Sequence, residues 1–458
     1  MAYPFHLVVA DPKKLRKIAK HARKLVDSRN GDPVMAISSM RIVLTPAAVG
    51  EIVDQAPTED VTGRRLSFDE LMARMGAEST SPLGPARLSE LLAAREPAEL
   101  GALPRQELDE SDLIRDGWDW HLKETRLVEA WDVFGGPENI DWKDIRVGQM
   151  DTGFRRIPAL GFENADSPRS GFVLTDFDRN FLPSDFQYDP LQGVGNPFAN
   201  EFSAEDPMLG GPFDGHGTRT GSVLAGYDPA ANPPYYGAAP RVPYIPVRIS
   251  DTVIINHAQE GLARAIEHLV RNGCSVLTLS MGMALTLIDD RVRKAIDYAY
   301  DQGVILVCAA GNTWDPVVAP ARLHRTIAVG GSTPAHTPWN GSSFGTEVDI
   351  SAPAWPVRRA SVDRKGRPTY AHGDGTSFAT PAVAATAALW LLHWGRKIDT
   401  TYPLKWQRVE AFKRLLTSTA QPGENWNTRQ YGAGILDAKA VLQADLPAAD
   451  TLLEDRSA

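Results

Sequence analysis

After about residue 113, short apolar segments alternate with helical ones, and this alternation limits the possible folds more than any other feature of the chain. The apolar segments are short and rich in Val, Ile and Leu, which is typical of strands buried on both faces. The expected strands cover residues 145–150, 244–249, 275–280, 304–310 and 326–329, and the expected helices cover 217–225, 257–271 and 289–301. This pattern predicts a parallel sheet with helices on both faces, and such sheets bind ligands at the carboxyl ends of their strands.

Four polar residues stand at strand ends or helix starts, where this rule predicts the functional site. Asp151 directly follows the first strand, and His216 begins the first helix. Asn312 follows a later strand, and Ser377 opens an apolar helix. A serine hydroxyl becomes a good nucleophile when a histidine removes its proton, and a carboxylate can fix the tautomer of that histidine. An amide and a backbone N–H at a helix start can stabilise the resulting oxyanion. These are the residue types that acyl transfer needs.

In their order along the chain, the four segments resemble the motifs of the subtilisin-like serine proteases. They are DTG at 151–153, HGT at 216–218, AAGN at 309–312 and GTSFATP at 375–381. The resemblance covers about residues 113–445 and implies a three-layer α/β fold with a mostly parallel central sheet. It also implies that Ser377 is the nucleophile, His216 the general base and Asp151 its orienting partner. Asn312 is then the side-chain donor to the oxyanion, together with the backbone N–H of Ser377.

The resemblance further implies which residues bind an extended protein or peptide substrate. Ser280, Met281 and Gly282 resemble the strand with which the substrate backbone pairs in this family. Ala310 and Gly311, just before the oxyanion asparagine, are expected to contact the substrate as well.

Four positions depart from the family pattern without changing a catalytic group. Met283 stands where a second glycine is frequent, which would narrow the specificity pocket. Arg219 replaces a histidine that is common after HGT. Gln149 and Met150 are bulkier or more polar than the usual residues before the aspartate.

The interval from Asp151 to His216 is 65 residues, which is long for this family and implies an insertion over about residues 155–213. The insertion carries many carboxylates: Glu163, Asp166, Asp176, Asp178, Asp185, Asp189, Glu201, Glu205 and Asp206. A structural calcium ion would use such a cluster, whereas a solvated loop would pack through its phenylalanines. Because no EF-hand-like spacing is present, the loop is the favoured interpretation and calcium the alternative. The chemistry itself needs no cofactor.

Composition divides the chain into four parts. Residues 1–80 form a small N-terminal α+β or helical segment, and residues 81–112 form a linker rich in Pro, Ala and Glu. Residues 113–445 form the subtilisin-like peptidase domain, and residues 446–458 form a C-terminal tail.

The N-terminal segment has two interpretations, a propeptide and a module that binds a regulatory partner. Strands are expected at 5–10 and 35–44, and helices at 12–26 and 68–75. Lysine and arginine cover the outer side of the first helix, which favours a solvated face over contact with a membrane or nucleic acid.

Charge and cysteine content limit the classes of partner and compartment. With 48 Lys and Arg against 57 Asp and Glu, the net charge is −9, which argues against binding nucleic acid through overall charge. Two cysteines, Cys274 and Cys308, cannot form a disulfide framework. Neither a secretory signal nor a membrane-spanning run is recognised, so the chain is expected to be cytoplasmic, without contact to a membrane.

The sequence therefore predicts a serine endopeptidase that hydrolyses peptide bonds through an acyl-enzyme intermediate. Two alternatives stay open. One is a latent or regulated protease effector that a partner or N-terminal processing activates. The other is a noncatalytic, protease-like binding protein.

Overall fold

The computed structural model describes residues 119–182, 203–206, 213–256, 258–283, 288–312, 316–363, 366–423 and 426–458, and the backbone of five short strands outside these ranges. Contacts divide the chain into two compact units. The first comprises Met1–Glu107, Pro183–Ala199 and Ala284–Leu287, and the second comprises Leu108–Leu182, Asn200–Met283 and Ile288–Ala458. All the candidate catalytic and substrate-binding residues belong to the second unit.

In the first unit, three short strands form an antiparallel sheet in the order β1-β3-β2. They are β1 (Phe5–Val8), β2 (Ile37–Ser38) and β3 (Arg41–Leu44), and all lie within the two expected strand regions. A further pair consists of β6 (Tyr188–Asp189) and β7 (Val194–Gly195). The helices expected at 12–26 and 68–75 and the linker at 81–112 lie outside the described residues. The propeptide and partner-binding interpretations stay predictions.

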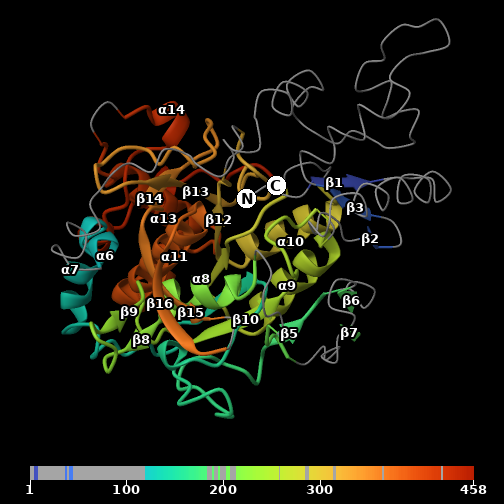
Figure 1. Cartoon of the computed structure of the whole chain (residues 1–458). Helices are drawn as coiled ribbons and strands as arrows, with labels where there is room; N and C mark the ends of the chain where they lie inside the picture. The colour runs from blue at the N-terminus through green and yellow to red at the C-terminus, as the bar shows by residue number, and fades with distance from the viewer. Residues whose placement is uncertain are drawn as a thin grey trace, which may run out of the picture. The chain divides into compact units, whose positions relative to one another are not determined.

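The second unit is built on a seven-stranded sheet in the order β14-β13-β12-β11-β4-β10-β5, in which every pairing is parallel (Figure 1). Its strands are β4 (Val147–Asp151), β5 (Arg179–Asn180), β10 (Tyr244–Arg248), β11 (Val276–Leu279), β12 (Ile305–Ala309), β13 (Ile327–Ser332) and β14 (Ile350–Pro353). Five of them lie at the strand positions expected from the sequence. The other two, β5 and β14, are not among the expected strands.

Helices cover both faces of the sheet and complete the predicted three layers. One face packs against α8 (His216–Ala225) and α11 (Thr376–Trp394), and the other against α9 (Gln259–Arg271) and α10 (Asp290–Asp301). Strand residues alternate between the two cores, because successive side chains of a strand point to opposite faces. This arrangement confirms the predicted fold class.

The helix α11 runs through the interior, and nearly all of its residues are buried. Its continuous apolar character therefore follows from its enclosure on all sides. Within the described part of the chain, no helix is both long enough and apolar enough to cross a membrane. Cys274 and Cys308 are buried thiols in the core beside α9 and α10, and burial raises the pKa of Cys274 to about 12.

Shorter elements surround these three layers. They are α6 (Trp120–Glu124), α7 (Leu127–Trp131), α12 (Arg396–Thr401), α13 (Gln407–Ser418), α14 (Thr428–Tyr431), α15 (Ala438–Gln443), the antiparallel pairs β8 (Tyr227–Asp228) with β9 (Tyr235–Tyr236) and β15 (Val357–Val362) with β16 (Pro368–Gly373), and the 3₁₀ turns Asp132–Phe134, Pro158–Leu160 and Ala449–Thr451.

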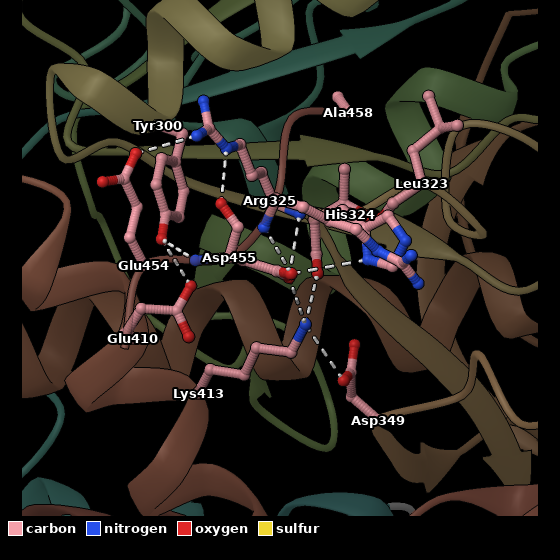
Figure 2. A network of polar contacts seen from close by, with 12 residues as sticks. Tyr300, Leu323, His324, Arg325, Asp349, Glu410, Lys413, Glu454, Asp455 and Ala458 are labelled. Atoms are coloured by element: carbon pink, nitrogen blue, oxygen red, sulfur yellow. Dashed lines mark hydrogen bonds and ion pairs between the residues drawn. The ribbon is translucent and has the colours of Figure 1, made fainter. Parts of the chain in front are cut away.

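The segment at 446–458 packs onto the rest of the second unit through a network of ion pairs and hydrogen bonds (Figure 2). Arg325, which is 8% exposed, lies at its centre. One guanidinium nitrogen donates to Asp297 of α10 at 3.0 Å, and another donates to Glu454 at 2.9 Å. The Nε of the same guanidinium donates to the backbone carbonyl of Asp455 at 3.1 Å. The end of the chain is thus tied to α10 and to the start of β13.

Candidate active site

The carboxyl end of β4 and the start of α8 bring Asp151 and His216 into contact. His216 Nδ1 lies 2.7 Å from Asp151 Oδ1, and both side chains are buried. Gly217 permits this approach, because a Cβ at that position would lie 2.0 Å from the carbonyl oxygen of Gly153. With Nδ1 donating to the carboxylate, Nε2 of the ring is the nitrogen that can accept a proton.

Two further residues hold the carboxylate of Asp151. The backbone N–H of Thr152 donates to Oδ1 at 2.7 Å, and Thr220 Oγ1 donates to Oδ2 at 2.9 Å. Gln149 Nε2 donates in turn to Thr220 Oγ1 at 2.8 Å and to the carbonyl of Gly217 at 2.9 Å. Sequence reasoning missed this role of Thr220. The signal was present, since Thr220 lies four residues after His216 and therefore on the same helix face.

Thr220→Val is expected to lower kcat about 10- to 100-fold while KM stays nearly constant. The change removes one hydrogen bond to a buried carboxylate at almost constant volume, and such bonds contribute about 1.5–3 kcal/mol. Thr220→Ser, which keeps the hydroxyl, should restore most of the rate. Steady-state kinetics on a peptide substrate and thermal unfolding of each variant test this expectation. A valine variant with normal kcat, or a serine variant as slow as valine, would contradict a positioning role.

The turn before His216 is fixed by one group from the insertion, Asp206, and by one from α8, Arg219. Asp206 Oδ2 accepts the backbone N–H of Gly215 at 3.0 Å, and the guanidinium of Arg219 donates to the backbone carbonyl of Asp214. Burial lowers the pKa of Arg219, although the nearby carboxylates favour its charged form. Arg219 thus helps to hold the turn from which His216 projects.

Ser377 lies in the first turn of α11, after Gly375, whose φ of 139° is unfavourable for other residues. Its hydroxyl donates to the carbonyl of Ser280 at 3.1 Å, and Ser280 Oγ donates to the carbonyl of Ser377 at 2.8 Å. This reciprocal pair joins the candidate nucleophile to residues 280–283, which follow β11 and are called here the extension of β11. Among the residues that the structure describes, the Ser377 hydroxyl donates to Ser280 O and makes no hydrogen bond to His216.

The amide of Asn312 is oriented by Thr376, a residue that sequence reasoning missed. Asn312 Oδ1 accepts the backbone N–H of Thr376 at 2.9 Å and its hydroxyl at 2.9 Å. Because the oxygen takes both donors, the Nδ2 group lies at the opposite side of the amide. It is 3.3 Å from the position that a Cβ on Gly375 would take, beside the turn that carries Ser377.

The extension of β11 differs from the expected substrate-pairing strand at one residue. The N–H of Gly282 donates to the carbonyl of Val253 at 3.0 Å, and Gly282 O accepts the N–H of Ile255 at 2.9 Å. The chain itself therefore occupies the backbone groups of Gly282 that the resemblance assigns to substrate. Met281 and Met283 are buried in the core beside α9 and α10.

The residues Ala310 and Gly311 extend β12 directly toward Asn312. The N–H of Ala310 donates to Val329 O at 2.9 Å, which continues the parallel pairing with β13. Gly311 has a φ of 111°, and its carbonyl accepts the N–H of Ser343 at 2.9 Å. The structure thus brings the nine candidate residues to the carboxyl ends of β4, β11 and β12 and to the starts of α8 and α11.

Three described carboxylates of the insertion, Asp178, Glu205 and Asp206, accept hydrogen bonds from other groups of the chain. Asp178 accepts the N–H of Ala204 at 2.9 Å, and its burial raises its pKa to about 7. Glu205 pairs with Arg156. No group of three or more His, Cys, Asp or Glu residues that could hold a metal ion is present among the described residues. Calcium stays an untested alternative to the favoured interpretation of a loop.

Comparison with known proteins places the chain in a family. The model of the subtilase family matches residues 143–434, so the chain belongs to the subtilase family. Alkaline elastase YaB of Bacillus sp. (strain YaB) is 28% identical over 229 residues, which are 50% of this chain and 55% of the elastase. Subtilisin DY of Bacillus licheniformis is 28% identical over 239 residues, which are 50% of this chain and 78% of that protein. The chain thus spans about half the length of the elastase that it matches.

Among solved structures, a protease from Pseudoalteromonas arctica shares the fold. Its TM-score is 0.54 at 20% sequence identity, and the match covers 71% of this chain and 96% of that chain. The fold predicted from the strand and helix pattern is therefore that of a solved protease.

Proposed function

We propose that this chain is a serine endopeptidase that hydrolyses protein or peptide substrates. Ser377 Oγ attacks the scissile carbonyl carbon, and His216 Nε2 accepts the hydroxyl proton. The C–N bond then breaks as His216 gives that proton to the leaving amine. Water adds to the acyl-enzyme in the second half-reaction, with His216 again as base, and releases the new carboxylate and the free serine. The Asn312 amide and the Ser377 N–H stabilise the oxyanion in both halves.

The contact between His216 Nδ1 and Asp151 Oδ1, at 2.7 Å, is the observation that supports this proposal best. It leaves Nε2 as the proton acceptor in a unit whose family is established. The N–H of Ser377 lies in the first turn of α11, where backbone donors have no partner within the helix. The Ser377 hydroxyl must exchange its acceptor, Ser280 O, for His216 Nε2. Such contacts often tighten only when substrate binds.

Labelling of the purified chain with a fluorophosphonate tests the proposed function. We expect stoichiometric labelling, loss of peptide cleavage in parallel, and a mass increase on the tryptic peptide that contains Ser377. Labelling of another residue would overturn the assignment of the nucleophile. A protein that neither takes up the reagent nor cleaves a casein substrate would instead be noncatalytic.

The pairing of Gly282 with Val253 and Ile255 favours a second candidate function. In this candidate the chain is a protease whose substrate-pairing edge, the backbone of Gly282, is closed by the segment 253–255 until the protease is activated. A substrate that pairs with Gly282 must first displace the segment 253–255. A small fluorophosphonate needs no such pairing, so it should react at once. A peptide with four residues before the scissile bond should be cleaved only after a lag, or only with an activating partner.

Ile255→Pro tests the closed edge, because proline removes the N–H that donates to Gly282. The expected result is a shorter lag and a higher initial rate of peptide cleavage, with the rate of fluorophosphonate labelling unchanged. Val253→Ala keeps both backbone hydrogen bonds and serves as the control. If the natural chain cleaves the peptide without a lag, at the rate of the proline variant, the edge is open in solution and this candidate is wrong.

A further inference from the structure

Beyond the carboxyl ends of the neighbouring strands β11 and β12, the segment 317–319 holds the two chain extensions together. The N–H of Met283 donates to Ala319 O at 2.6 Å, and the N–H of Ala319 donates back to Met283 O at 3.1 Å. On the other side, the N–H of Val318 donates to Ala310 O at 2.9 Å. Backbone hydrogen bonds to both extensions therefore fix the position of this segment.

The side chain of Val318 points to two glycines. Val317 and Ala319 belong to the core beside α9 and α10, whereas Val318, only 8% exposed, belongs to neither of the two large cores. A Cβ on Gly282 would lie 2.2 Å from Val318 Cγ2, and a Cβ on Gly311 would lie 2.9 Å from Val318 Cγ1. The valine methyl groups thus fill the volume that side chains at both glycine positions would take.

Both glycines lie next to the proposed reacting groups. Gly311 immediately precedes Asn312, and Gly282 lies two residues after Ser280, whose carbonyl accepts the Ser377 hydroxyl at 3.1 Å. The scissile carbonyl group must lie close to both the serine oxygen and the asparagine amide. The substrate residue that carries this carbonyl bears its side chain on the adjacent Cα, one bond from the carbonyl carbon. That side chain therefore enters between the ends of β11 and β12, where the valine methyl groups lie.

We propose that Val318 restricts the residue before the scissile bond to glycine, alanine or serine. This inference rests on the proposed endopeptidase function and names its substrate preference. A hydrogen or a methyl group fits beside the valine, whereas a leucine or phenylalanine side chain would overlap its methyl groups. The backbone bonds on both sides of the segment prevent it from moving aside, and overpacking of this kind is unfavourable.

The test compares kcat/KM for peptides that differ only in the residue before the scissile bond, with Ala, Leu or Phe at that position. The natural chain should prefer Ala over Phe by at least about 100-fold, since each excess methylene in a restricted site can cost about 10-fold or more. Val318→Gly should lower this preference to less than about 10-fold by raising the rate for Phe, and Val318→Ala should fall between them.

Val317→Ala is the matched control, because it removes a valine that faces the core and should leave the ratio of Ala to Phe cleavage unchanged. A natural chain that cleaves after Phe as fast as after Ala overturns the inference while leaving the endopeptidase function intact. So does a glycine variant with an unchanged ratio. A chain that cleaves none of the peptides and takes up no fluorophosphonate overturns the proposed function itself, and this inference with it.

Discussion

Ser377→Ala is expected to lower kcat on a peptide substrate by on the order of 10⁶-fold and to abolish fluorophosphonate labelling. The change removes the atom that forms the acyl-enzyme bond, while the donors of Asn312 and of the residue 377 backbone remain. Residual hydrolysis by water therefore still benefits from oxyanion stabilisation, as in serine proteases whose triads are disabled. Because the substrate contacts are unchanged, KM should change little.

The structure also predicts that this variant folds normally. Within the described part of the chain, the Ser377 side chain makes one hydrogen bond, to Ser280 O at 3.1 Å, and alanine fits the same space. The melting temperature should therefore stay within a few degrees, since a single hydrogen bond contributes about 1 kcal/mol. Ser418→Ala, on α13, is a matched control that should keep full labelling. Labelling that persists in the Ser377 variant would show that another residue is the nucleophile.

His216→Ala provides a second check on the same assignment. If Ser377 and His216 act as one unit, the double variant should be about as slow as either single variant, since the losses are then far from additive. Two independent losses that multiply would argue against a shared proton transfer.

The fold could be predicted from the sequence because its main determinants are local. Runs such as residues 304–310 are apolar at every position, and this happens when a strand is buried on both faces between helices. The strand β14 (Ile350–Pro353) could not be found in this way. It contains Ser351 and Pro353, and its place at the sheet edge depends on pairing with β13 rather than on its own composition.

The candidate site was predictable for a related reason. Asp151, His216, Asn312 and Ser377 stand at strand ends and helix starts, and these positions can be located from the segments themselves. Their partners depend on contacts between distant segments. Neither Thr376 as the residue that orients Asn312 nor the pairing of Gly282 with residues 253–255 follows from local pattern.

The position of Val318 illustrates the same limit. Nothing in its neighbourhood along the chain distinguishes it from Val317, and only the register of the hydrogen bonds from the segment 317–319 to Ala310 and Met283 determines which valine faces the glycines. A shift by one residue would exchange the two side chains. The motifs thus predict the reaction, whereas the specificity proposed for Val318 depends on the register.

Asp151→Asn is expected to lower kcat about 10⁴-fold, a smaller loss than removal of the serine or the histidine. Three donors converge on the Asp151 carboxylate: the N–H of Thr152, the hydroxyl of Thr220 and Nδ1–H of His216. An asparagine offers one acceptor oxygen and one NH₂ group. If the amide oxygen of the asparagine still accepts the N–H of Thr152, its NH₂ group must face the Thr220 hydroxyl or the His216 Nδ1–H. Two donors would then face each other without an acceptor.

The imidazole can relieve that conflict by moving its proton to Nε2, so that Nδ1 accepts from the amide. In that tautomer Nε2 can no longer take the proton of Ser377, and the imidazolium would also lack a carboxylate. Both effects lower kcat rather than raise KM. Asp289→Asn, at the N-cap of α10, is the matched control, because asparagine caps helices as well as aspartate does and activity should stay normal. If Asp151→Asn keeps activity within about 10-fold of the natural chain, the carboxylate does not set the tautomer, and the 2.7 Å contact is structural only.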